Sequence, residues 1–124
     1  MSRLVLIVFL IIASSIVLAS GCSKVANIPS DPKVLAAKSH EILSANCIRC
    51  HGPQKRVFDM NNRDELLAKK SPKRGLVFLV PGKPDQSAIW KVLDEDQMPP
   101  GPPKLNSEQK QILKKWIEAG APAS

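Results

Sequence analysis

The sequence is poor in the large side chains that usually build a protein core. It has no tyrosine, two tryptophans and three phenylalanines among 124 residues. Aromatic side chains bury large areas and dominate the energetics of most cores. A small domain with so few of them has room in its core for a group that is not protein.

The sequence also lacks the residue patterns of common enzymes and nucleic-acid binders. It contains no Ser/His/Asp set, paired-carboxylate site or phosphate-binding loop, and no internal repeat. Basic residues do not alternate with aromatic ones as they do in single-strand binders, so we expect no nucleic-acid partner. The formal net charge of +7 favours acidic partners or an anionic membrane surface instead.

The first 21 residues have the layout of a secretory signal peptide. Leu4 to Leu18 are almost all apolar, and small residues follow at 19–21. We therefore expect residues 1–21 to be a signal peptide of the lipoprotein type. A retained membrane anchor is the alternative, although a spanning helix usually needs about 20 apolar residues.

The end of this segment, LASGC, resembles the bacterial lipoprotein box, with Ala19 where the box usually has leucine. The resemblance implies that Cys22 is lipidated and becomes the mature N-terminus. Residues 22–30 would then be a tether of roughly 15 Å that holds the protein at the periplasmic face of a bacterial membrane. The alternatives are ordinary cleavage nearby and a free or disulfide-bonded Cys22.

Residues 31–124 are predicted to form one domain. Asp31 followed by Pro32 is typical of a helix start, and this first helix should run to about Asn46. The composition of the following segment predicts a short helix around residues 64–69.

The middle of the domain combines one apolar run with several prolines. Residues 75–80 (GLVFLV) suggest either a short strand or an extended segment lying against a cofactor. A helix through residues 88–93 should follow, with Asp85 as its cap. Residues 98–103 (MPPGPP) cannot be helix or central strand because four of the six are proline.

The last helix has the clearest sequence signals. Asn106 and Gln109 have the spacing of a capping box, and Gly120 stands where a C-terminal cap is expected. One apolar face is predicted, formed by Ile112, Leu113, Trp116 and Ile117.

The stretch SANCIRCHGPQ, residues 44–54, carries the strongest chemical signal. Zinc needs four ligands in a tetrahedral site, and the adjacent Cys50 and His51 rarely point at one ion. A redox dithiol is expected at the start of a helix, whereas this motif follows one. Covalent haem attachment accounts for the whole motif: Cys47 and Cys50 would form two thioether bonds, and His51 would bind the iron.

The second axial position of such an iron needs a ligand or a vacancy. Met98 is the preferred candidate because it lies far downstream and precedes two prolines that stiffen its loop. Met60 follows His51 by only nine residues, which leaves little chain to pass round the haem edge. We expect Met60 to fill the core or pack on the haem, and His40 to lie on the surface of the first helix.

With these motifs the sequence resembles a class I c-type cytochrome, and more closely the planctomycete-type cytochrome c domain. The matching segments are CIRCHGP, VPGKPDQSAIWKVL, MPP and LNSEQKQILKKWIEAGAP, within roughly residues 40–124. The resemblance implies an all-α fold around one covalently bound haem c, with crossing N- and C-terminal helices, and it supports Met98 as the distal ligand. The family tends to have a Gly-rich apolar stretch where this chain has KRVFDMNN.

These features predict an exported, lipid-anchored and monomeric cytochrome that carries single electrons and is not an enzyme. Its partners would be redox proteins with acidic docking surfaces. Two alternatives stay open at this point. One is a haem sensor or peroxidatic domain in which Met98 is displaced or unbound, and the other is a haem relay subunit of a larger redox complex.

Overall fold

The fold is helical, and the computed structural model describes residues 27–54 and 57–124 of it. The predicted all-α class is confirmed, since pairing within this part of the chain is limited to one isolated bridge between Lys70 and Val77. A strand at residues 75–80 is therefore wrong, and the extended alternative is the observed one. The elements are α2 (Pro32–Asn46), α3 (Arg63–Ala68), the 3-10 turn η1 (Pro84–Gln86), α4 (Ala88–Asp94) and α5 (Ser107–Glu118).

Helix α2 has the predicted bounds and the predicted cap. The Asp31 carboxylate accepts hydrogen bonds from the backbone N–H groups of Lys33 at 2.8 Å and Val34 at 3.0 Å. These bonds satisfy donors that have no partner inside the helix, which fixes where it begins. Its buried face consists of Leu35, Ala36, Ser39 and Leu43.

Helix α5 confirms the capping box. Asn106 accepts from the backbone of Gln109 at 2.8 Å, and the Gln109 side chain accepts from the backbone of Asn106 at 3.0 Å. After the helix, Gly120 has a φ of 93°, a left-handed conformation that suits glycine. The predicted apolar face is the buried one, with Ile112, Leu113, Trp116 and Ile117 all in the core.

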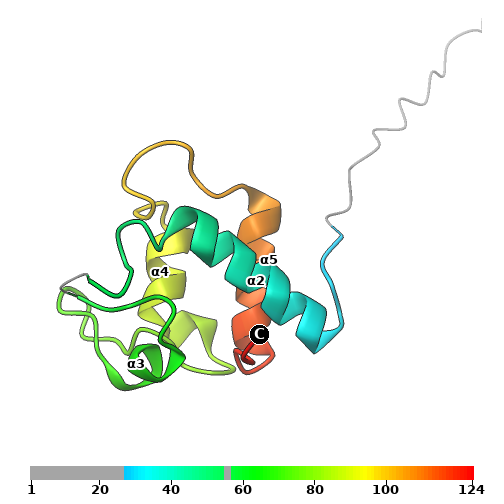
Figure 1. The fold of residues 1–124 in the computed structure, drawn as a ribbon, viewed down its shortest axis with the longest axis horizontal. Coiled ribbons are helices and arrows are strands. Elements are labelled where there is room, and N and C mark those ends of the chain that lie inside the picture. Colours follow the sequence, from blue (N-terminus) through cyan, green and yellow to red (C-terminus); the bar gives the residue numbers. More distant parts are fainter. Residues whose placement is uncertain (1–26, 55–56) are drawn as a thin grey trace, which may run out of the picture.

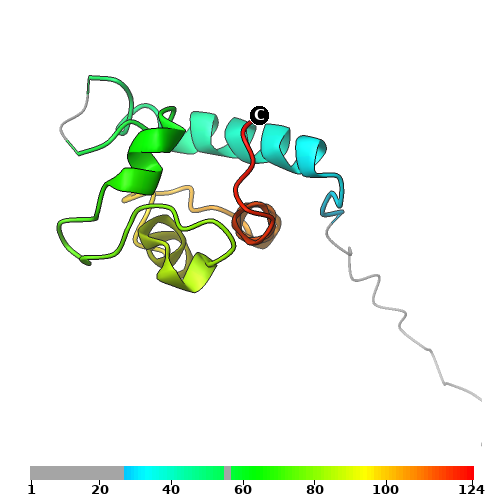
Figure 2. The ribbon, with the colours of Figure 1, turned by 90° about the horizontal axis from the view of Figure 1, so that it is seen from below.

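Helices α2 and α5 cross and pack against each other, as the cytochrome resemblance implied (Figure 1). Helices α4 and α5 lie on the same side of α2, and α4 packs on α5 (Figure 2). Helix α3 and long loops form the side of the molecule away from this crossing (Figure 1). Most of the buried apolar side chains come from these three helices, joined by Phe58, Met60, Leu66, Phe78, Leu79, Leu105 and Ala121.

The start of α4 differs from the prediction. Asp85 lies within η1, and Ser87 is the N-cap residue. Ser87 is fully buried, and its hydroxyl accepts from the N–H of Val80 at 2.9 Å and donates to the carbonyl of Lys83 at 3.0 Å. The hydroxyl thus ties the extended segment to the start of α4. A cap at Asp85 was wrong because the chain makes an additional turn before the helix.

The predicted signal peptide at residues 1–21, Cys22 and most of the tether lie outside the described residues. Within residues 27–54 and 57–124, no helix has both the length and the apolar character needed to cross a membrane.

The crossing of α2 and α5 provides a test of what stabilises the fold. Leu113→Ala removes a side chain that is 1% exposed, and should lower the free energy of unfolding by about 2–5 kcal/mol. The matched control is the neighbouring Gln111→Ala on the exposed face of α5, which should change it by less than about 0.5 kcal/mol. Urea unfolding followed by circular dichroism measures both, and equal effects would contradict the assigned core face.

Candidate functional site

The CIRCH motif forms a tight turn directly at the end of α2. Cys47 is the C-cap residue, and its N–H donates to the carbonyl of Leu43 at 2.8 Å. The carbonyl of Cys47 accepts from the N–H groups of Cys50 at 3.0 Å and His51 at 2.8 Å. One carbonyl therefore fixes the two cysteines and the histidine relative to one another and to the helix.

The glycine after the histidine is required by this turn. A Cβ atom at Gly52 would lie 2.8 Å from the carbonyl oxygen of Ile48, closer than real Cβ contacts. Any other residue would have to open the turn, so Gly52 helps to keep His51 in place.

The two thiols differ in environment and do not form a disulfide. Cys47 is half-buried, and burial together with the neighbouring Cys50 raises the pKa of its thiol to about 11. Cys50 is exposed. In the described part of the chain, no three His, Cys, Asp or Glu side chains are grouped so that they could hold a metal ion.

The His51 ring lies against two phenylalanines. It stacks on Phe58 with a distance of 4.4 Å between ring centroids and an interplanar angle of 11°. The ring of Phe58 in turn packs against that of Phe78, with 4.2 Å between the ring centroids. Burial lowers the pKa of His51. The neutral imidazole, which is the form that binds metals, is thereby favoured near neutral pH.

His51 and Met98 line the same cavity, although they are far apart in the sequence. Its volume is about 610 Å³, within the range of roughly 300–1,000 Å³ typical of ligand sites. Cys47 and Cys50 are not among the lining residues, but they belong to the turn that carries His51. The remaining lining residues are Val57, Phe58, Ser71, Pro72, Lys73, Arg74, Phe78, Ala88, Ile89, Val92, Gln97 and Pro100.

Met98 is held at the end of α4 by its backbone. The N–H groups of Gln97 and Met98 both donate to the carbonyl of Val92, at 2.9 and 3.0 Å. Across the cavity, Arg74 donates to the side chain of Gln97 at 2.9 Å and forms an ion pair with Glu95. The guanidinium holds the pKa of the Glu95 carboxyl below its usual range. These contacts join the 71–74 wall of the cavity to the Met98 wall.

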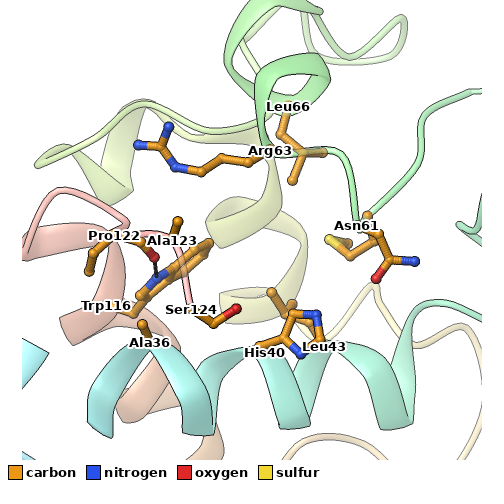
Figure 3. Close-up of a pocket in the computed structure, with 11 residues that line it drawn as sticks. Ala36, His40, Leu43, Asn61, Arg63, Leu66, Trp116, Pro122, Ala123 and Ser124 are labelled. Carbon is orange, nitrogen blue, oxygen red and sulfur yellow. Dashed lines mark hydrogen bonds between the residues drawn. The ribbon is translucent and has the colours of Figure 1, made fainter. Parts of the chain in front are cut away.

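Met60 and His40, the less favoured iron ligands, line a different cavity (Figure 3). This second cavity, of about 160 Å³, lies between α2, residues 60–66 and the C-terminal segment. Met60 is buried in the core and His40 is exposed on α2, as expected for both. Trp116 also lines this cavity, and its indole N–H donates to the carbonyl of Pro122 at 2.9 Å.

The sequence does not predict several residues that line the cavity shared by His51 and Met98. Lys73 and Arg74 belong to the basic segment 69–74, whose composition predicts a solvent-exposed surface. Both residues nevertheless line the cavity. Phe58 lies in the segment whose composition departs from the family. Phe78 also lines the cavity, and for this residue the sequence does carry a signal. It belongs to the apolar run 75–80, for which one of the two interpretations is an extended segment lying against a cofactor.

A helical fold in which a CxxCH turn places its histidine on a cavity shared with a distant methionine is the arrangement expected of a c-type cytochrome domain. Residues 47–102 match the family model described as Planctomycete cytochrome C. The match is consistent with a planctomycete-type cytochrome c domain, and it suggests a haem-binding c-type cytochrome. The match contains the CxxCH motif and Met98, and leaves out α2 and α5. Comparison with curated proteins and with solved structures finds no match for the chain.

The environments of the two thiols predict unequal reactivity. In haem-free chain carrying Cys22→Ser, iodoacetamide at neutral pH should modify Cys50 at least about tenfold faster than Cys47, because a buried thiol with a pKa of about 11 carries little thiolate. Mass spectrometry of quenched digests measures both rates. The same chain in denaturant is the control and should lose the difference. A Cys47 that reacts as fast as Cys50 in the folded chain would contradict the assigned burial.

Proposed function

We propose that this protein is a membrane-tethered, monohaem c-type cytochrome that carries single electrons between redox partners. The observation that carries the proposal is the shared cavity: His51 and Met98 line one space that is large enough for a cofactor. Their side chains come from two different parts of the fold, the turn after α2 and the loop after α4.

The cavity suits a flat, largely apolar ring that carries two carboxylates. Ile89 and Val92 of α4 and the ring of Phe78 provide apolar walls. Lys73 and Arg74 also line it, whereas none of the described residues that line it carries a carboxylate. Haem has this character, with an apolar macrocycle and two propionates. The basic residues would meet the propionates, because a buried carboxylate requires a charged partner.

We assign each motif residue one role. Cys47 and Cys50 would hold the haem through thioether bonds, and His51 and Met98 would be the two protein ligands of its iron. When bound, the haem supplies an iron that changes between the ferric and ferrous states by one electron. The neutral form of His51, favoured by its burial, leaves a ring nitrogen available as ligand.

Filling both axial positions from this chain favours electron transfer over catalysis. With His51 and Met98 as its two protein ligands, the iron would have no position open for a substrate or a gas molecule. The electron can then pass with little change in ligation. Methionine opposite histidine also raises the reduction potential, and burial within the cavity tunes it further.

The charge of the protein supports a docking role for its basic surface. The chain has a formal net charge of +7; the exposed Lys73 lies in the segment 71–74 that forms one wall of the cavity, and the exposed Lys70 directly precedes that segment. An acidic redox partner would be steered to this edge, where charge complementarity speeds encounter more than it tightens binding. A lipid on Cys22 would raise the local concentration near membrane-bound partners.

The distal ligand is tested by Met98→Ala in the exported, haem-loaded protein. The methionine-to-iron charge-transfer band of the ferric protein should disappear, because the sulfur that causes it is removed. Met60→Ala is the matched control, since Met60 lines the other cavity, and it should leave the band in place. Absorption spectroscopy measures both variants.

Two outcomes of this experiment would reject electron transfer through a closed iron. One is a wild-type protein without the band whose ferric spectrum is high-spin and shifts on addition of ligand, which is the behaviour of a sensor. The other is a band that persists in Met98→Ala and is lost in Met60→Ala.

The tether is tested separately by Cys22→Ser. We expect the wild-type protein to partition with membranes and to carry a lipid on Cys22, because the lipoprotein-box resemblance places the modification there. The variant should carry no lipid at position 22 and should keep its haem spectrum unchanged. Cell fractionation and mass spectrometry of the mature N-terminus measure this, and an unmodified Cys22 in the membrane-bound wild type would reject the lipid anchor.

A further inference from the structure

We propose that Lys104 is a positioning residue that holds the Met98 loop, residues 95–103, in the conformation that presents the methionine sulfur to the cavity. The inference rests on the proposed role of Met98 as distal ligand and extends it to a residue with no such assignment. Lys104 lies outside the segment matched by the family, which ends at residue 102.

The ammonium group of Lys104 binds the backbone on both sides of Met98. Its Nζ donates to the carbonyl of Asp96 at 2.8 Å and to the carbonyl of Pro99. These two carbonyls lie before and after the methionine in the sequence. A single cation therefore bridges the two ends of the short segment that carries the ligand.

The loop needs such a donor because of its composition. Prolines at positions 99, 100, 102 and 103 have no N–H group, so they cannot donate the backbone hydrogen bonds that fix most turns. A side chain with several donors can replace them, and Lys offers three. Lys104 thus supplies from a side chain what this segment cannot supply from its backbone.

The start of the loop is also a conformation that requires support. Asp96 has a φ of 53°, in the left-handed region that residues other than glycine adopt at a cost. Its carbonyl is held by Lys104, and its carboxylate forms an ion pair of 2.8 Å with Lys110 of α5. The Met98 loop is therefore fixed to the C-terminal helix at one end and closed by Lys104 across its middle.

Lys104 would therefore set the fraction of molecules in which Met98 occupies the distal position. A loop that opens exposes the sixth position of the iron to external ligands, and the apparent affinity for such ligands rises with the open fraction. Lys104→Leu removes the donors and keeps an alkyl side chain. In the ferric, haem-loaded protein we expect it to bind added imidazole about five- to thirty-fold more tightly than the wild type.

Two further variants separate positioning from general effects of the substitution. Lys104→Arg keeps a cation with donors of similar reach and should restore imidazole affinity to within about threefold of the wild type. Lys33→Leu, at an exposed position in the first turn of α2, removes the same charge far along the chain from the loop and should leave the affinity unchanged. The methionine-to-iron charge-transfer band should weaken in Lys104→Leu alone.

Titration with imidazole, followed by absorption in the ferric state, decides the outcome. If the wild type has the charge-transfer band and Lys104→Leu matches it in both band and imidazole affinity, the proposal for Lys104 is overturned while the role of Met98 stands. An equal rise in affinity in Lys33→Leu also overturns it, because the effect would then belong to charge alone. A wild type with covalent haem and no band overturns both assignments.

Discussion

The carbonyl oxygen of Cys47 is the point on which the site depends. It accepts hydrogen bonds from the N–H groups of both Cys50 and His51, so the turn that carries the motif is fixed to the C-cap residue of α2. Because α2 is itself fixed by its crossing with α5, the position of the histidine follows from the packing of the two long helices. Local hydrogen bonding and the distant core thus act on the same side chain, and Gly52 permits the turn by leaving space beside Ile48.

The opposite wall of the cavity is built by other means. Helix α4 supplies Ile89 and Val92 to the cavity, and the carbonyl of Val92 holds the N–H of Met98. Beyond that residue, prolines remove the usual backbone donors, and charged side chains take their place. Arg74 joins the loop to the 71–74 wall, and Lys104 binds the backbone carbonyls before and after Met98. One wall is therefore fixed by a helix end, and the other by side-chain hydrogen bonds across a loop.

The sequence predicts this architecture unevenly, for physical reasons. The bounds of α2 and the capping box of α5 follow from local rules, because a cap is a contact between residues three or fewer apart. The grouping of Cys47, Cys50 and His51 is equally local. Local rules do not predict Ser87 as the cap of α4, because its hydroxyl accepts a hydrogen bond from the backbone N–H of Val80, seven residues earlier. The same holds for Arg74, which bonds Gln97 from 23 positions earlier, because a basic residue in a basic segment carries no signal of such a contact. Lys104 bonds residues only five and eight positions before it, but no sequence rule pairs a lysine with these carbonyls.

The central claim is that His51 and Met98 bind one iron from opposite sides. Its most direct test is X-ray absorption at the iron edge of the exported ferric protein. We expect nitrogen neighbours from the porphyrin and His51 together with a single sulfur neighbour. A first coordination shell without sulfur, or with an oxygen in its place, would contradict it.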